Sequence, residues 1–193
     1  MQRSRTHISR WLLPLLLVCG FAATVPAVAS AKSGKSTTGT WITRVAAPFV
    51  YIDPDGYEPG VAAPLKEVTW MRWELTEDED GLILGYNTYY SRDSEGGNES
   101  RGTLCMVGAR QGKRIAFSEA YAIYEGQPVP DFSTVPIFQF SCEQKGKKKL
   151  QCLGSGLSNL QPTALQAVLE RSKGQGNLPP VPEAAREICQ PGS

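Results

Sequence analysis

The fold of this chain is decided by residues 66–91, which read KEVTWMRWELTEDEDGLILGYNTYYS. Residues 82–87 alternate between two faces with the period of two that is typical of a β-strand. The polar stretch TEDEDG, residues 76–81, separates this strand from residues 66–75 and has the composition of a hairpin loop. Residues 66–91 therefore predict an antiparallel hairpin with aromatic side chains on both of its faces.

Further short strands are predicted on either side of this hairpin. Turn residues separate them, as expected for an antiparallel protein. The predicted segments are residues 40–45, 49–52, 102–109, 113–117, 135–143 and 149–153. Residues 118–125 fit either a strand or a short helix. About eight short strands predict an all-β fold, an antiparallel barrel or sandwich, with one C-terminal helix.

The C-terminal region carries the predicted helix. Thr163 and Gln166 have the spacing of a capping box, and an apolar stripe follows them. We expect this helix to end at Gly174 and to pack on the sheet. The prolines of residues 178–182 predict an extended tail, and residues 183–188 predict one helical turn.

Residues 1–31 have the three zones of a secretory signal peptide: a basic start, an apolar run and small residues before the cleavage site. The arginines and the alanine-rich end are typical of a bacterial leader. The small-x-small rule predicts a mature chain that begins at Ser30 or Lys32, and an uncleaved anchor is the alternative. We therefore expect a periplasmic or secreted protein with no stable membrane insertion after cleavage.

The mature chain has the size of one compact domain, about 162 residues. We divide it into a flexible lead-in (32–39), an antiparallel β domain (40–157) and a helix with a disulfide-tethered tail (158–193). Its net charge of −2 argues against nucleic-acid binding. The charge is uneven, with twelve acids and three bases in residues 53–99 but ten bases and five acids in residues 101–173.

Four cysteines remain after cleavage, and an even number in an exported protein predicts two disulfides. Four cysteines allow three pairings. The hairpin spacing favours the one that places Cys142 opposite Cys152, which leaves Cys105 to pair with Cys189 and tether the tail. A metal site is the rival use of four thiols, but the chain has no C-x-x-C pair and no histidine outside the leader. We therefore expect no metal and no cofactor.

The tripeptide Gly39-Thr40-Trp41 opens the first predicted strand. It resembles the G-x-W with which lipocalins and related calycin barrels begin, and the mature size, late helix and tail-to-barrel disulfide are also similar. The resemblance covers three residues. It implies a small antiparallel barrel that carries a small apolar ligand.

Catalytic groups are scarce in this sequence. Its only histidine, His7, lies in the leader, so the mature chain lacks Ser-His and Cys-His pairs. Glu67, Glu74 and Glu119 lie in or beside predicted strands, but no two of them have the geometry of a hydrolase pair. We expect them to be exposed strand carboxylates, and we expect no catalytic residues. A carboxylate-dependent hydrolase is a distant alternative.

The remaining candidates for function are aromatic and acidic side chains of the central hairpin. Tyrosine and tryptophan give large contact areas at little entropic cost, and an acidic tip at the hairpin orients a charged partner. The predicted binding residues are Trp70, Trp73, Tyr86, Tyr89, Tyr90, Glu77, Asp78, Glu79 and Asp80. We expect an exported, disulfide-stabilised protein of a bacterial envelope that binds another macromolecule as an inhibitor or immunity-type protein. A lipocalin-like carrier of a small apolar ligand is the alternative.

Overall fold

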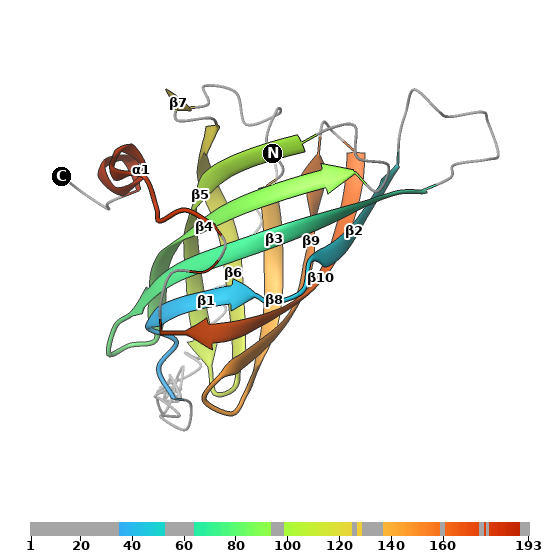
Figure 1. The fold of residues 1–193 in the computed structure, drawn as a ribbon. Coiled ribbons are helices and arrows are strands. Elements are labelled where there is room, and N and C mark those ends of the chain that lie inside the picture. Colours follow the sequence, from blue (N-terminus) through green and yellow to red (C-terminus); the bar gives the residue numbers. More distant parts are fainter. Residues whose placement is uncertain are drawn as a thin grey trace, which may run out of the picture.

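A computed structural model describes residues 35–52, 64–93, 99–124, 127–128, 137–158, 161–173, 176 and 178–189. The predicted signal peptide lies outside the described residues. The described part of the chain is an antiparallel β-barrel with a short C-terminal helix, as Figure 1 shows. The prediction of an all-β fold is confirmed, and the architecture is a closed barrel rather than a sandwich.

The barrel is built from long strands joined largely in sequence order. The elements are β1 (Gly39–Thr43), β2 (Ala47–Ile52), β3 (Pro64–Glu77), β4 (Leu82–Asp93), β5 (Glu99–Gln111), β6 (Arg114–Tyr124), β7 (Gln127–Pro128), β8 (Ile137–Lys145), β9 (Lys149–Ser158), β10 (Gln161–Ser172) and α1 (Glu183–Ile188). The predicted central hairpin is the β3–β4 hairpin, in which Trp73 lies opposite Asn87.

The ring closes through β10, which pairs with β9 on one side and with β1 and β2 on the other. β1 and β2 together occupy one position in it. β1 pairs with β10 and β3 near one end of the barrel, and β2 pairs with the same two strands further along. Eight positions therefore close the sheet, in the order β1/β2, β3, β4, β5, β6, β8, β9, β10. The β3–β4, β5–β6 and β8–β9 hairpins all lie at one end, which we call the hairpin end.

The predicted helix after Thr163 is wrong, because residues 161–172 form strand β10. This strand pairs with β9 from Gln161 to Glu170. Its buried residues recur with period two, and they are Thr163, Leu165, Ala167 and Leu169. Pairing along the whole strand and burial of this face outweigh the local capping signal. The extended tail and the helical turn at residues 183–188 are as predicted.

Large side chains fill the barrel interior. Trp73 packs edge-on against Phe117 and Phe140, with ring centroids 5.2 and 5.0 Å away. Glycines make room for these rings, since a Cβ at Gly108 would lie 2.5 Å from the Phe117 ring and one at Gly154 would lie 2.7 Å from Phe140. The close packing explains why two small residues occupy strand interiors, where glycine otherwise weakens a strand.

Both disulfides join the expected cysteines. Cys142 and Cys152 are directly opposite each other on β8 and β9, and Cys105 on β5 is bonded to Cys189 just after α1. Disulfides of this kind are typical of an oxidising compartment, extracellular or periplasmic. The second bridge holds the tail against the outer wall of the barrel.

Residues 35–38 are the described part of the segment before β1, and they are packed against the barrel. Residues 32–39 were expected to be a flexible lead-in. Thr37 is fully buried, and its backbone N–H and hydroxyl donate to Glu77 at 2.5 and 2.8 Å. The indole of Trp41 donates to the Thr37 carbonyl at 2.7 Å. Arg171 of β10 stacks over the Trp41 ring at 4.9 Å and donates to the carbonyls of Ser36 and Thr38. This segment thus covers the hairpin end of the barrel.

Candidate functional site

The C-terminal tail and the outer wall of the barrel enclose a groove, which we call the tail groove. Its volume is about 680 Å³. One wall is the proline-rich tail and the other is formed by β4, β5 and β6. Its lining residues are Thr88, Tyr89, Tyr90, Arg101, Gly102, Thr103, Ile123, Leu178, Pro179, Pro180 and Pro182. Two of the predicted binding residues, Tyr89 and Tyr90, belong to this set.

The tail is held in place at several points, so the groove is preformed. Val181 and Ala185 are buried against Ile123 and Tyr86, and the disulfide to Cys105 fixes the end of α1. Figure 1 shows α1 beside β4 and β5 on the outside of the barrel. Prolines lose little conformational freedom on ordering, so a wall built from them costs little entropy when a ligand binds.

An ion-pair cluster fastens α1 to the barrel. Arg186 of α1 donates to Glu74 of β3 at 2.8 Å and lies over the Tyr86 ring at 5.4 Å. Arg72 donates two hydrogen bonds to the same carboxylate. Burial opposes the ionisation of Glu74, but the bonds from Arg186 and Arg72 outweigh it and lower its pKa. Glu74 is therefore not the exposed carboxylate that was expected.

The polar groups of the tail groove are few and lie on β4 and β5. The Thr88 and Thr103 hydroxyls are 3.3 Å apart, and the Tyr90 hydroxyl donates to Glu99 at 2.6 Å. The guanidinium of Arg101 is exposed at the same wall. The groove thus combines the apolar tail, the Tyr90 ring and the Arg101 cation. Such a lining suits a mainly apolar molecule with an acceptor group.

The five predicted aromatic residues fall on two faces of the β3–β4 hairpin. Trp73 and Tyr89 are buried in the barrel core, although one edge of Tyr89 reaches the tail groove. Trp70, Tyr86 and Tyr90 lie on the outer face and are partly exposed. The alternation predicted from the sequence therefore holds, but mainly the outer set is available to a partner. Tyr86 is packed under the tail.

Trp70 and Tyr90 form an aromatic pair on the outer wall, with ring centroids 5.6 Å apart. Arg92 lies over the Trp70 ring at 5.4 Å. Since Tyr90 also lines the tail groove, this pair extends the groove onto the open surface of β3 and β4.

The four acidic residues predicted at the hairpin tip, residues 77–80, do not form one exposed surface. Glu77 is not part of an exposed surface: its carboxylate is only 8% exposed and pairs with Arg110 at 2.5 Å. Asp78 accepts hydrogen bonds from the backbone N–H groups of Asp80 and Leu82, both at 2.9 Å, and so fixes the turn. Glu79 and Asp80 are exposed, as expected for a solvated tip.

Glu119 is a buried carboxyl that sequence reasoning placed on the surface, and that expectation is wrong. It is 4% exposed on the inner face of β6, next to a register shift in the β5–β6 pairing. Asn87 donates to one of its oxygens at 2.7 Å, and the Phe138 N–H donates to the other at 3.0 Å. Burial raises the pKa of Glu119 to about 7, although both hydrogen bonds oppose the shift.

The described residues contain no group of three or more His, Cys, Asp or Glu side chains arranged to hold a metal ion. Within the same part of the chain, no helix is long and apolar enough to cross a membrane.

Comparisons with known proteins give no relative. No family model and no curated protein matches the sequence. Among solved structures, "Structure of EF1p2_mFAP2b bound to DFHBI" is similar, with 10% sequence identity, a TM-score of 0.43, and coverage of 70% of this chain and 93% of that one. A likeness of this strength assigns neither family nor function to the present chain.

Proposed function

We propose that this chain is an exported, non-enzymatic β-barrel that binds a small, largely apolar molecule in the tail groove. The groove itself is the observation that supports this. Its volume of about 680 Å³ lies within the range of small-molecule sites, and its lining is mainly apolar. The lack of any histidine outside the leader supports binding rather than catalysis.

The cation at the groove narrows the class of ligand. Arg101 lies beside the Tyr90 ring and the two threonine hydroxyls, whereas the tail wall is apolar. A flat molecule with an anionic or acceptor group at one end satisfies both walls at once. An aromatic sulfonate such as anilinonaphthalene sulfonate has this chemistry and serves as a probe.

Fluorescence titration of the mature protein with anilinonaphthalene sulfonate tests the proposal. We expect saturable binding that Arg101→Ala weakens by about tenfold, because a hydrogen bond to a charged group is lost. Arg92→Ala is the matched control, since Arg92 is also exposed on this wall but does not line the groove. Equal affinities in the two variants, or no saturable binding, would contradict a ligand site in the groove.

The natural ligand is sought by native mass spectrometry of the protein purified from its own host. A bound molecule of defined mass that is absent from a groove-blocking variant, Thr103→Trp, supports the proposal. Intact mass of the same sample tests export, because cleavage of the leader predicts a chain that begins at Ser30 or Lys32. A full-length chain would contradict export with cleavage.

A second candidate function is the binding of a macromolecule at the outer aromatic pair. The partly exposed rings of Trp70 and Tyr90, with Arg92 above the former, support it. Tryptophan, tyrosine and arginine are enriched among the few residues that carry most of the binding energy in protein interfaces. Cross-linking in envelope extract compares the wild type with Trp70→Ala. A cross-linked partner that does not depend on Trp70 would remove this candidate.

A further inference from the structure

The outer wall of the barrel carries a band without a single charged side chain. Starting from Leu82 and following the register across the sheet, the outward residues are Leu82, Ala109, Ala116, Ser141, Leu153 and Gln166. The neighbouring row, from Leu84, reads Leu84, Val107, Ser118, Gln139, Ser155 and Ala164. One residue in five of the chain is charged, so this gap on a water-facing wall is a deviation that needs an explanation.

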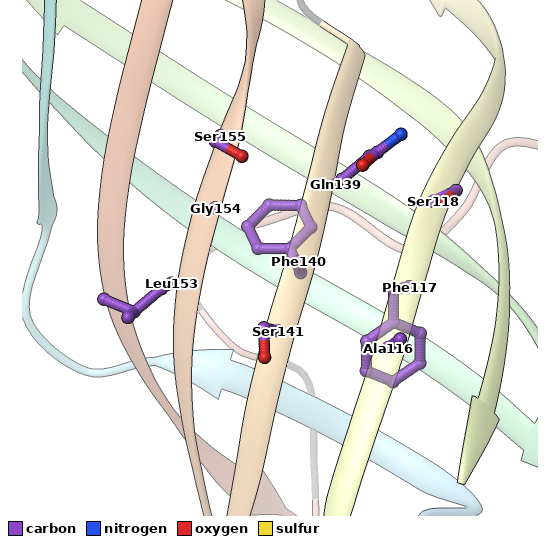
Figure 2. Close-up of a pocket in the computed structure, with 9 residues that line it drawn as sticks. All are labelled: Ala116, Phe117, Ser118, Gln139, Phe140, Ser141, Leu153, Gly154 and Ser155. Carbon is purple, nitrogen blue, oxygen red and sulfur yellow. The ribbon is translucent and has the colours of Figure 1, made fainter.

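A hollow lies in the middle of the band. It has a volume of about 360 Å³ and lies on β6, β8 and β9. Figure 2 shows the short side chains of Ala116, Ser118, Ser141 and Ser155 around it, with Leu153 at its rim. Short side chains here leave space that a longer one would fill. Leu153 is 62% exposed, although it is a large apolar residue.

A ridge stands at the other end of the same band, on β4 and β5. Leu82, Leu84 and Val107 form it, and their exposed fractions are 57%, 42% and 44%. Leu84 and Val107 are direct cross-strand partners, so their side chains stand together. The ridge shares no strand with the hollow. One molecule can therefore contact one neighbour through its ridge and a second neighbour through its hollow at the same time.

The hairpin tips nearest the ridge and the hollow carry opposite net charges. The exposed acids Glu79 and Asp80 lie just before Leu82 at the tip of the β3–β4 hairpin. The β8–β9 hairpin, next to the hollow, carries four lysines, Lys145 and residues 147–149. Lys145 and Lys149 pair with acids of the same wall, whereas Lys147 and Lys148 have no ion pair among the described residues. Both hairpins lie at the hairpin end, so barrels packed side by side with parallel axes bring opposite charges together.

We propose that this protein associates with copies of itself, the ridge of one molecule docking in the hollow of the next. Ridge and hollow are different surfaces, so the contact is heterologous and closes into a ring or extends into a chain. Apolar burial supplies the attraction, and the acidic and lysine hairpins set the orientation. The tail groove takes no part, so the proposal does not depend on ligand binding.

Sedimentation velocity of the mature protein between about 1 μM and about 1 mM tests self-association. We expect the wild type to form species larger than a dimer as concentration rises. High salt screens the hairpin charges, so it should shift this association to higher concentration without abolishing it. Leu84→Asp removes the ridge and Ser141→Glu fills the hollow with a charge. Each variant alone is expected to stay monomeric. Val45→Asp is the control, because Val45 is 80% exposed between β1 and β2 and lies in neither surface.

Sedimentation of a mixture of the two variants tests whether the ridge docks in the hollow. Each variant keeps one intact surface, so an equal mixture of Leu84→Asp and Ser141→Glu should form a 1:1 dimer and nothing larger. Val107→Asp replaces Leu84→Asp if the latter fails to fold, as judged by its thermal unfolding. A wild type that stays monomeric, a mixture that stays monomeric, or an equal loss in Val45→Asp overturns the proposal. A different protein that binds the wild type but not Ser141→Glu, while the wild type itself is monomeric, also overturns it.

Discussion

Two carboxyl groups on the inner face of the barrel, the half-buried Glu77 and the buried Glu119, lie in opposite electrostatic environments. At the hairpin end, Glu77 is paired with Arg110 and accepts two hydrogen bonds from Thr37. Deeper in the wall, Glu119 accepts bonds only from the Asn87 amide and the Phe138 N–H. Burial opposes ionisation of both. The bonds from Arg110 and Thr37 outweigh it at Glu77 and lower its pKa, whereas at Glu119 burial prevails.

The comparison shows that burial alone does not set the charge of a carboxyl in this barrel. A cation within hydrogen-bond distance keeps Glu77 ionised, and its absence leaves Glu119 protonated below neutral pH. β8 connects the two sites, because Gln144 accepts from Arg110 at 2.8 Å and the Phe138 N–H donates to Glu119. Changes at either site therefore act on the same strand.

The Arg110 guanidinium is the charge that distinguishes the two carboxyl sites. Arg110→Met leaves Glu77 buried without its partner, and we expect a loss of about 3–5 kcal/mol in the free energy of unfolding. Urea unfolding at pH 7 measures it. Arg114→Met, an exposed arginine close by, is the control. The double variant Glu77→Gln/Arg110→Met should recover part of the loss, and a double variant no better than Arg110→Met would contradict this account.

The free energy of unfolding should depend on pH in opposite directions at the two carboxyl groups. Because the folded pKa of Glu119 is raised to about 7, its contribution to stability is complete below the unfolded pKa near 4.3 and is lost as pH rises to 7. The loss amounts to about 3 kcal/mol. Glu77 acts oppositely, since its lowered pKa gives a contribution that is lost as the solution becomes more acidic than its unfolded pKa.

Unfolding free energies of Glu119→Gln and the wild type from pH 4.5 to pH 8 check the sign for Glu119. The variant cannot ionise, so its stability should gain on that of the wild type as the pH rises. Parallel curves would show that Glu119 does not titrate in this window. Glu143→Gln serves as a control, because Glu143 is exposed on the outer wall.

The disulfide between Cys142 and Cys152 fixes β8 to β9 between the two carboxyl sites. Replacing both cysteines by serine should cost about 2–3 kcal/mol, mainly through the greater freedom of the unfolded chain. Urea unfolding under oxidising conditions measures the cost. The same measurement on the wild type under reducing conditions should approach the variant, and an unchanged midpoint in the variant would contradict the role of the bridge.

The smallest expected effect concerns the segment that covers the hairpin end. Arg171→Leu removes the stacking on Trp41 and two hydrogen bonds, and we expect a loss of about 1–2 kcal/mol. Hydrogen exchange should show that protection falls first at Thr37 and Thr38. Exchange that rises uniformly over the barrel instead would show that Arg171 stabilises the whole fold rather than this segment.

Local pattern predicted much of the fold. Residues 66–91 alternate with period two and enclose a polar loop, and the structure has the β3–β4 hairpin there. The cysteine pairing was found because a hairpin register is set by the few residues at its turn. The segment after Thr163 was misread because a capping box is a local signal, whereas the alternation of its buried residues has meaning only beside a neighbouring strand.

The candidate site was less accessible to sequence reasoning. Tyr90 and Tyr89 were singled out, but Arg101, Ile123 and the prolines of the tail were not. These residues are distant in the chain. Strand register brings Arg101 and Ile123 to the groove, and the packing of the tail and its disulfide to Cys105 bring the prolines there. The uncharged band on the outer wall could not be recognised in the sequence, since each strand contributes only two of its residues.

Alternation and short spacing in the sequence predict the all-β class, the central hairpin and the Cys142–Cys152 bridge. The Cys105–Cys189 bridge spans 84 residues and was inferred only as the remaining pair. Contacts between distant strands determine that the ring closes, that residues 161–172 form a strand, that Glu119 is buried and that Glu77 is half-buried. The physical reason is that burial and charge state depend on neighbours across the sheet. Arg110 lies 33 residues from Glu77, and Asn87 lies 32 residues from Glu119. Such neighbours are fixed by strand register and barrel closure, which no single stretch of the chain encodes.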